Sequence, residues 1–337
     1  MKRNAFFDNA KLVLIFLVVF GHLIQPSAQG SSTMHTIYIW IYTFHMPAFI
    51  FLSGFFAKGA GNKDYIYNLA KKLLLPYLIF QMLYTGFYFF IGKSSWQTGL
   101  FDPQWALWFL FSLFSWHLLL IGFKKINPAI GLSIAFAIGL LAGYIPEVGS
   151  SFSLSRTFVF FPFFLAGYWM HAHQLNVLKK PIVRVLSLAV LSLTAVYIYA
   201  STNFDSGWLL ASKSYTELGM PIGGIVARAT VYITAIVMSA SIFAWIPSRH
   251  FKLTTLGART LYVYLLHGFF IQTFRKKDLF TVDNAVDAGI IVLLAAGLVL
   301  LLSSKPVLGI WQPFIEGRWT VLKQYVKSAF GKQSTSQ

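Results

Sequence analysis

The sequence predicts an all-α protein, a polytopic membrane bundle of about ten transmembrane helices with both termini in the cytosol. Of its 337 residues, 57% are hydrophobic and only 11% are charged, whereas soluble domains average about 45–50% apolar and about 25% charged residues. The apolar residues form long runs without strand-like alternation, and in lipid such runs satisfy their backbone hydrogen bonds as helices. Basic residues gather in the short gaps between runs, as is typical of cytosolic loops.

Ten runs approach the roughly 20 residues that a helix needs to cross a bilayer. In chain order they cover residues 10–25, 36–56, 73–92, 105–122, 127–145, 156–173, 182–200, 221–245, 257–273 and 285–303. The first run lacks a small-residue cleavage site and has Asp8 and Lys11 beside it, so we expect an uncleaved first span rather than a signal peptide. The ninth run is the least regular, because Arg259 and His267 lie within it.

The charge distribution sets the predicted topology and the domain division. With the N-terminus inside, ten spans place 20 of the 27 lysines and arginines, but only three of the ten acids, on the cytosolic side. This is the positive-inside pattern. We therefore expect one transmembrane domain over residues 1–304, followed by a basic, amphipathic cytosolic tail over residues 305–337 that lies on the membrane surface. The net charge of +17 follows from topology, and no soluble basic domain remains to bind nucleic acid.

Several kinds of chemistry are excluded by composition and motif. The chain has no cysteine, so thiol catalysis, disulfides and cysteine-based metal sites are absent. It has no H-E-x-x-H motif, and carboxylates are almost absent from the runs, so we expect no metal. A P-loop, a dinucleotide-binding fingerprint and a nucleophile elbow are also missing.

The segment from Asp8 to His22 is the first candidate for a site. Lys11 and His22 are eleven positions apart, which on a helix is about three turns and roughly 16 Å, with nearly the same facing. Ionisable residues inside a membrane usually face a bundle interior and mark function. Imidazole titrates near neutrality, so His22 suits a general base acting on a hydroxyl. The alternative is a histidine satisfied at the outer end of a helix, but the adjacent Gly21 opens space for a close neighbour and favours function.

The second run contributes His45, which precedes Pro47 within the apolar segment. Proline removes a backbone donor and kinks a helix, so His45 is predicted to lie in a buried polar network with a functional or structural role. Ser53 and Gly54, near the cytosolic end of the same run, are interpreted either as support for the site or as residues that allow close helix packing.

Five further positions complete the candidate set. Lys71 and Lys72 lie beside the third span, where they are either topology anchors or a docking site for a phosphate-bearing cytosolic ligand. Trp105 and Trp108 begin the fourth run, as members of an aromatic belt or as residues that stack on a sugar ring. His267 in the ninth run joins the histidines inside spans.

Taken together, these segments resemble the acyltransferase-3 family of membrane-bound O-acyltransferases, particularly its branch of fucose 4-O-acetylase-like and intercellular-adhesin-modifying proteins. The resemblance extends over most of the chain and follows the family's order of motifs. The matching segments are D-N-A-K…L-V-V-F-G-H (8–22), F-H-M-P-A-F-I-F-L-S-G-F-F (44–56), K-K-L-L-L-P-Y (71–77), L-W-F-L (107–110) and L-Y-V-Y-L-L-H (261–267).

The resemblance implies transfer of an acyl group, usually acetyl, from cytosolic acyl-CoA to a sugar hydroxyl at or near the outer face of a bacterial plasma membrane. The family's first-span motif, a basic residue and a histidine separated by ten residues, falls on Lys11 and His22, with lysine where many members have arginine. Its basic pair falls on Lys71 and Lys72, which are adjacent here rather than spaced as R-x-x-R. The implied partners are acyl-CoA, a glycan acceptor and membrane lipid.

A second hypothesis is an exporter or carrier of a polysaccharide or lipid-linked sugar that transfers no acyl group. Ten spans with buried histidines suit a proton-coupled carrier. The scarcity of carboxylates in the spans and the absence of a span-length repeat argue against it.

Overall fold

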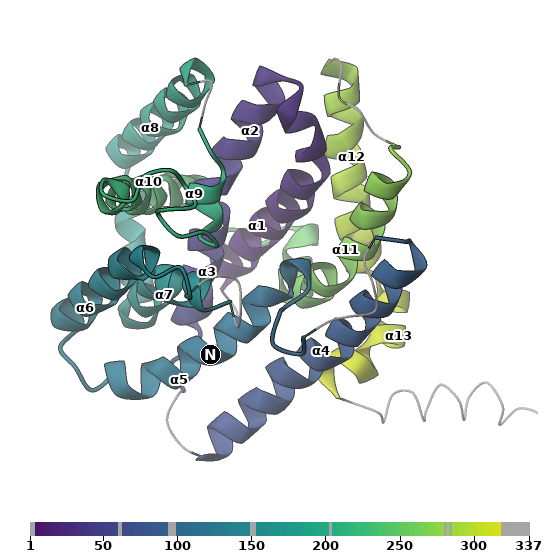
Figure 1. Ribbon diagram of the computed structural model, residues 1–337, viewed down its shortest axis with the longest axis horizontal. Helices are drawn as coiled ribbons and strands as arrows, with labels where there is room; N and C mark the ends of the chain where they lie inside the picture. The colour runs from purple at the N-terminus through teal and green to yellow at the C-terminus, as the bar shows by residue number, and fades with distance from the viewer. Residues whose placement is uncertain are drawn as a thin grey trace, which may run out of the picture.

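The computed structural model describes residues 4–59, 63–93, 99–148, 153–201, 204–279, 282 and 285–317. Throughout these ranges the regular structure is helical, and no strand occurs among them, which confirms the predicted all-α class (Figure 1). The longer helices are α1 (Ala5–Ile24), α2 (Ser32–Tyr42), α3 (His45–Phe55), α4 (Lys63–Phe90), α5 (Trp108–Phe123), α6 (Pro128–Leu141), α7 (Leu154–Trp169), α8 (Pro181–Ala200), α10 (Gly224–Trp245), α11 (Thr260–Lys276), α12 (Ala285–Leu302) and α13 (Lys305–Glu316).

Six of the described segments are long and apolar enough to cross a membrane: α1, α2 with α3, α4, α5 with the turn before it, α8 and α10. Helices α12 and α13 pass the same test only as a pair, and they are bent by 64° at the break between them. The remaining predicted spans correspond to shorter helices, α6, α7 and α11, of 14, 16 and 17 residues. The number of ten spans and the cytosolic placement of both termini stay predictions.

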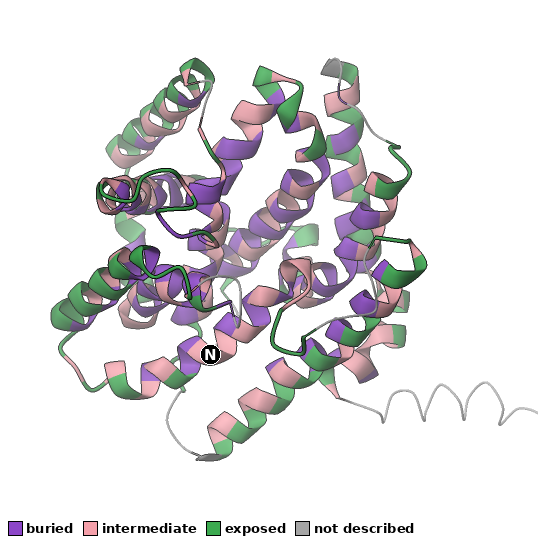
Figure 2. Ribbon diagram, in the orientation of Figure 1, coloured by how far each residue is buried: buried purple, intermediate pink, exposed green. Residues whose placement is uncertain are grey.

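Helix α1 runs through the middle of the molecule. It contacts α2, α3, α11, α12 and the 3₁₀ segment η6 (Lys252–Ala258) (Figure 1). In its most apolar 18-residue stretch 67% of the residues are buried, against 11% in α8, whose surface is largely exposed (Figure 2). A helix that is apolar on all sides is expected to be buried among other elements, so α1 is the natural carrier of an interior site.

The second predicted span is broken between α2 and α3. Pro47 lies in the first turn of α3, where its missing N–H is tolerated, and the preceding turn supplies the break. The Ile41 carbonyl at this break accepts hydrogen bonds from the Phe44 backbone at 3.3 Å and from His45 Nδ1 at 2.9 Å. The kink predicted from Pro47 is therefore present, and His45 helps to satisfy the backbone that the kink releases.

Helices α3 and α7 pack backbone against backbone. A Cβ atom at Gly54 would lie 1.8 Å from the Phe164 carbonyl oxygen, and one at Gly167 would lie 1.9 Å from the Phe51 carbonyl oxygen. Both distances are far inside van der Waals contact, so only glycine fits at either position. Gly54 thus has the packing role that the sequence offered as one interpretation, while Ser53 Oγ bonds within its own helix, to the Phe49 carbonyl at 3.0 Å.

The first turns of α1 are fixed to the loop that precedes α11. Asn9 Nδ2 donates to the carbonyls of Pro247 and Arg249 at 2.9 and 3.0 Å, and Asn9 Oδ1 accepts from Thr254 Oγ1 at 2.7 Å. A Cβ at Gly257 would lie 2.0 Å from the Asp8 carbonyl oxygen. The D-N-A-K segment therefore anchors the N-terminal end of α1 against η6.

Basic side chains satisfy the carbonyl ends of three helices. Lys58 Nζ donates to the Met170 carbonyl after α7 at 2.9 Å, Lys179 Nζ donates to the Phe243 carbonyl of α10 at 2.8 Å, and Arg259 donates to the residue that follows α12. The last carbonyls of a helix lack intrahelical donors, and positive charge is favourable there. Partial burial lowers the pKa of Lys58 below its usual range. These three basic residues thus bind the carbonyl ends of helices, in addition to the role in topology that the sequence predicts for them.

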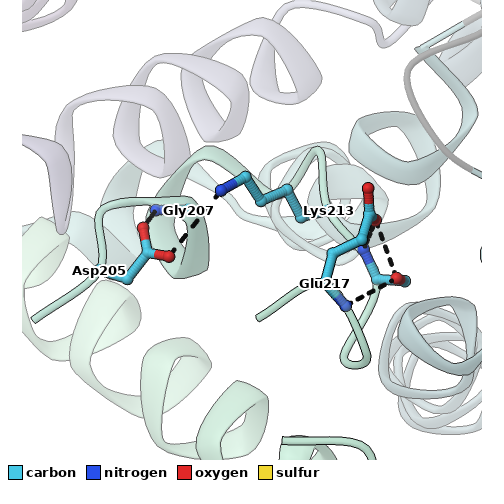
Figure 3. A network of polar contacts seen from close by, with 5 residues as sticks. Asp205, Gly207, Lys213 and Glu217 are labelled. Carbon is cyan, nitrogen blue, oxygen red and sulfur yellow. Dashed lines mark hydrogen bonds and ion pairs between the residues drawn. The ribbon is translucent and has the colours of Figure 1, made fainter. Parts of the chain in front are cut away.

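Two connecting elements complete the fold. Between α8 and α10 the short helix α9 (Gly207–Leu210) begins where Asp205 accepts from the Gly207 N–H at 2.7 Å, and Lys213 lies 3.9 Å from the same carboxylate (Figure 3). At the other end, α13 packs against α4, α11 and α12, with the ring centroids of Trp311 and Phe80 5.6 Å apart. The rest of the predicted tail, residues 318–337, lies outside the described residues, and the domain division remains a prediction.

Candidate active site

His22 lies in the last turn of α1, and its ring is oriented by a residue of α2. The Nδ1 atom of His22 is 3.1 Å from Tyr42 Oη. A Cβ at Gly21 would lie 3.1 Å from the Tyr42 ring, so the glycine next to His22 admits this close neighbour. The side chain is half-buried. Tyr42 therefore holds one nitrogen of the His22 ring, and Nε2 is the candidate for chemistry.

Two other rings pack on the His22 imidazole. The ring centroid of Trp105 is 4.5 Å away and that of His267 is 5.7 Å away, and Trp105 and His267 are 5.1 Å from each other. Trp105 has a φ of 41°, a left-handed conformation that is rare for bulky residues and is kept only where the surroundings enforce it. Gly268 permits this packing, because a Cβ there would lie 2.4 Å from the Trp105 ring.

The tautomers of His45 and His267, two other buried histidines, follow from their partners. Nδ1 of His45 is 2.9 Å from the Ile41 carbonyl, and Nδ1 of His267 is 2.9 Å from the Val263 carbonyl. A carbonyl oxygen only accepts, so each Nδ1 carries the hydrogen and each neutral ring has a lone pair at Nε2. His267 Nε2 is buried and has no hydrogen-bond partner within the described ranges. The site thus contains a free acceptor beside His22.

Arg275, near the end of α11, joins this cluster through the backbone of α1. Its Nη2 atom donates to the His22 carbonyl at 2.6 Å and to Gln25 Oε1 at 2.7 Å, and Gln25 Nε2 donates to Tyr38 Oη at 3.2 Å. The guanidinium also lies 5.9 Å from the Trp105 ring centroid, within range of a cation–π contact. Arg275 therefore ties the carbonyl end of α1 to α11.

Two cavities share the His22 side chain. One, of about 250 Å³, is lined by His22 together with Pro26, Arg275 and Asp278. The other, of about 40 Å³, is mostly apolar and is lined by His22 with residues such as Met46 and Phe49 of α3. A larger hollow of about 350 Å³ between η1 (Pro26–Gln29), α2 and α8 includes no predicted site residue. His22 stands at the junction of a small apolar space and a larger one that also has the charged side chains of Arg275 and Asp278 in its lining.

The structure gathers only part of the predicted set around His22. Trp105 and His267 contact its ring, and His45 is buried behind Tyr42, with ring centroids 4.5 Å apart. Trp108 lines the smaller cavity and stacks on Phe160 at 5.6 Å. Trp105 thus has a site contact as well as its place at the predicted membrane boundary.

The predicted basic residues lie away from His22. Lys11 Nζ pairs with Asp8 at 3.0 Å, three turns before His22 on α1. Lys71 and Lys72 are exposed on α4, and the same helix reaches the site at Tyr84, whose hydroxyl donates to the Leu265 carbonyl. Thirteen residues of helix are about 20 Å. A ligand that contacts both Lys71 or Lys72 and His22 must therefore be long.

Sequence reasoning missed Tyr42 and counted three arginines only as charges of the outer side. Arg275 belongs to the site, and Arg228 of α10 is 2% exposed, with its guanidinium over the Trp208 ring. Arg156 of α7 lies over the Trp108 ring at 5.0 Å. Because Arg228 falls inside an apolar run, its position was a usable signal of a buried charge. Tyr42 carried no such signal, since tyrosine is common in apolar helices.

Among the described residues, no group of three or more histidine, aspartate or glutamate side chains could hold a metal ion. The chemistry around His22 is that of imidazole, hydroxyl and guanidinium groups, with the Asp278 carboxylate in the lining of the larger of its two cavities. It suits proton transfer and hydrogen bonding to a polar ligand.

Fold and site define a helical membrane protein with a histidine at the meeting point of two interior cavities. The sequence matches the acyltransferase domain family over residues 4–304, and the chain belongs to this family. It is also similar to the nodulation protein NolL of Sinorhizobium fredii, with 26% identity over 306 residues that cover 82% of this chain and 80% of the relative. A NolL protein of Mesorhizobium japonicum is 31% identical over 155 residues, 40% of this chain and 42% of that one. No solved structure matches the chain.

The hydrogen bond between Tyr42 and His22 yields a first prediction. The Tyr42→Phe variant loses the hydroxyl that lies 3.1 Å from His22 Nδ1. Without this contact the transition state loses about 1.4 kcal/mol of stabilisation, which corresponds to a rate about tenfold lower. We expect kcat for acyl transfer to fall with KM for the donor unchanged, in steady-state assays of the purified protein. Tyr67→Phe, at an exposed tyrosine of α4, is the matched control. Equal kcat values in the two variants would contradict the role given to Tyr42.

Proposed function

We propose that the protein is an O-acyltransferase that moves an acyl group, acetyl in the first instance, from acyl-CoA to a hydroxyl of a cell-surface or lipid-linked glycan, with His22 as general base. Membership of the acyltransferase family supports the reaction class. The observation that carries the proposal is that one imidazole borders two cavities, a smaller apolar one and a larger one whose lining also includes Arg275 and Asp278. The acyl group of the donor and the hydroxyl of the acceptor would thereby meet at the His22 side chain.

In this mechanism Tyr42 accepts the Nδ1 hydrogen of His22, which leaves the lone pair of Nε2 for the acceptor. The hydroxyl gives its proton to Nε2 while its oxygen attacks the thioester carbonyl carbon. The C–S bond then breaks, the CoA thiolate leaves, and the proton on His22 returns to that sulfur. The oxyanion formed in between needs a donor, and the indole N–H of Trp105, whose ring packs on His22, is our assignment.

The donor would bind from the end of α1 that carries Lys11. Coenzyme A bears phosphates on one end and its thiol on a long arm, and lysines hold phosphate as point charges. Lys71 and Lys72 are exposed and unencumbered by ion pairs in the described structure, which suits a phosphate contact. An extended arm is needed, because these lysines and Lys11 lie roughly 15–20 Å of helix from the His22 level.

The test of the reaction compares surface glycans from bacterial cells with and without the gene, where the protein resides in the plasma membrane. Mass analysis is expected to find an acetyl increment that depends on the gene. In parallel, the full-length protein in nanodiscs should move label from acetyl-CoA to such a glycan. Glycan movement across proteoliposomes without acyl-CoA, together with no acetyl increment, would refute the transferase and favour a carrier.

The size of the apolar cavity predicts a preference for short acyl groups. Phe49 lines this space of about 40 Å³, so Phe49→Ala enlarges it. Each added methylene in a fitted pocket changes discrimination by about 1–3 kcal/mol. We expect the ratio of propionyl to acetyl transfer to rise about tenfold, measured with the two acyl-CoA donors in competition.

The control for this variant is Phe90→Ala, at a side chain of α4 that is 85% exposed. It removes the same ring from the protein without touching the cavity. If the ratio rises in both variants or in neither, the apolar cavity is not the acyl site.

A further inference from the structure

A second polar cluster lies beside the cavity of about 250 Å³ that His22 lines, where the ends of α4 and α11 meet. It consists of Tyr88, Lys93, Gln272 and Arg275, and we call it the Lys93–Arg275 cluster. Lys93 Nζ donates to Gln272 Oε1 at 2.7 Å and lies 4.9 Å from the centre of the Tyr88 ring. Gln272 precedes Arg275 by one helical turn, on neighbouring positions of the α11 surface. Arg275 lines the cavity with His22, so the cluster is continuous with the site.

Three buried polar atoms of this cluster have no hydrogen-bond partner in the part of the chain that the structure describes. They are Tyr88 Oη, Gln272 Nε2 and Arg275 Nε. Because an ammonium group only donates, Lys93 holds the oxygen of the Gln272 amide and the NH₂ group is turned elsewhere. A buried donor without a partner is unfavourable, because nothing compensates for its lost contact with water. Three such atoms in one place call for a ligand that accepts hydrogen bonds.

The charge of the cluster specifies the ligand further. The ion pairs found within the described ranges are those of Lys11 with Asp8 and of Lys213 with Asp205 (Figure 3), so neither Lys93 nor Arg275 has a carboxylate partner there. One nitrogen of Arg275, Nη2, donates to the His22 carbonyl and to Gln25 Oε1. The cavity lining also contains the Asp278 carboxylate, but the two cations with free donors outnumber it. They complement an acceptor-only anion, and carboxylate and phosphate have this chemistry.

We propose that the Lys93–Arg275 cluster binds an anionic group, carboxylate or phosphate, on the acceptor glycan and so places a neighbouring hydroxyl at His22. The cavity of about 250 Å³ is below the range of about 300–1,000 Å³ for drug-sized ligands, so it accommodates one charged sugar unit. Identification of the ligand as the acceptor rests on the proposed acyl transfer. Anion binding itself does not require the donor.

The test uses the full-length protein in phosphatidylcholine nanodiscs without any acyl donor. Calorimetric titrations compare glucose, glucuronic acid and glucose 1-phosphate. We expect at least one of the charged sugars to bind about tenfold or more tightly than glucose, and Lys93→Gln to remove most of that advantage. Gln272→Glu keeps the shape and the contact to Lys93 but adds a negative charge, so it should abolish the preference for the anion.

Lys213→Gln is the matched control, since it removes one positive charge that is paired with Asp205 at 3.9 Å instead of belonging to the cluster. It should bind the charged sugars like the unmodified protein. Equal affinity for glucose and both charged sugars would overturn the proposal. An equal loss in Lys93→Gln and Lys213→Gln would also overturn it, because the effect would then be one of overall charge.

Two further measurements are made. One distinguishes a lipid headgroup from a glycan as the source of the anion, and the other distinguishes failure of anion binding from failure of the proposed acyl transfer. In phosphatidylglycerol nanodiscs, native mass spectrometry would detect a retained anionic lipid. A lipid that Lys93→Gln releases, with no preference for charged sugars, would assign the cluster to a headgroup and refute the acceptor site. If charged sugars bind through the cluster but no acyl group is transferred to any of them, the proposed function fails while anion binding stands.

Discussion

Replacing His22 with alanine is expected to lower the rate of acyl transfer about 10²–10⁴-fold, the usual contribution of a general base. The side chain borders both cavities and is held at Nδ1 by Tyr42, so its removal leaves no group in the same position to take the hydroxyl proton. The measurement is transfer of label from acetyl-CoA to glycan by the full-length protein in nanodiscs, at saturating concentrations of both substrates.

The controls keep the fold and vary the histidine. His22→Gln preserves a polar side chain of similar length but cannot act as a base near neutral pH, and we expect it to be as inactive as His22→Ala. His173→Ala removes an exposed histidine and should retain full activity. A well-folded His22→Ala protein with unchanged turnover would refute the assignment of the base, whatever the reaction proves to be.

The second large effect concerns stability. Gly54→Ala places a methyl group 1.8 Å from the Phe164 carbonyl oxygen, and the obstruction is backbone, which cannot rotate away. Overpacking costs about 1–3 kcal/mol and occasionally more, and we expect a loss of about 3 kcal/mol. The measurement is the midpoint of unfolding in mixed micelles with increasing sodium dodecyl sulfate. Since α3 carries His45 and lines the apolar cavity, activity should fall with the folded fraction.

Gly297→Ala is the matched control for the stability effect. Gly297 also lies inside a helix, but no atom lies within 4 Å of its added Cβ. Alanine is favoured over glycine in a helix by about 1 kcal/mol, so this variant should be unchanged or slightly more stable. If Gly54→Ala behaves like Gly297→Ala, helices α3 and α7 are not packed as closely as described.

Much of the fold was predictable, because the properties that define a membrane helix are local. The long apolar runs appear as helices, the second of them is interrupted in the turn before Pro47, and His22 falls near the end of α1, one of the two candidate spans with the largest buried share. Helix lengths were less predictable. Runs such as 156–173 correspond to helices shorter than a full span, since turns and caps end a helix before its apolar composition does.

Sequence reasoning selected His22, whose role stays a prediction, and it missed several of the residues that surround it. Lys11 shares a helix face with His22, but a shared face does not bring two side chains together when three turns separate them. Arg275 looked like a loop charge because it follows an apolar run, yet it bonds the carbonyl of His22. Its role depends on how α11 crosses α1, which no pattern within either segment encodes.

Composition, run length and charge placement were sufficient to predict a helical membrane protein and to single out His22, because each is a property of a residue and its neighbours along the chain. Which groups surround His22 was settled by packing between segments far apart in sequence. Gly21 admits Tyr42 from α2, and Gly268 admits Trp105, so small residues at helix contacts bring the rings together. These contacts depend on distances between helices, and a single sequence specifies such distances only through the folded whole.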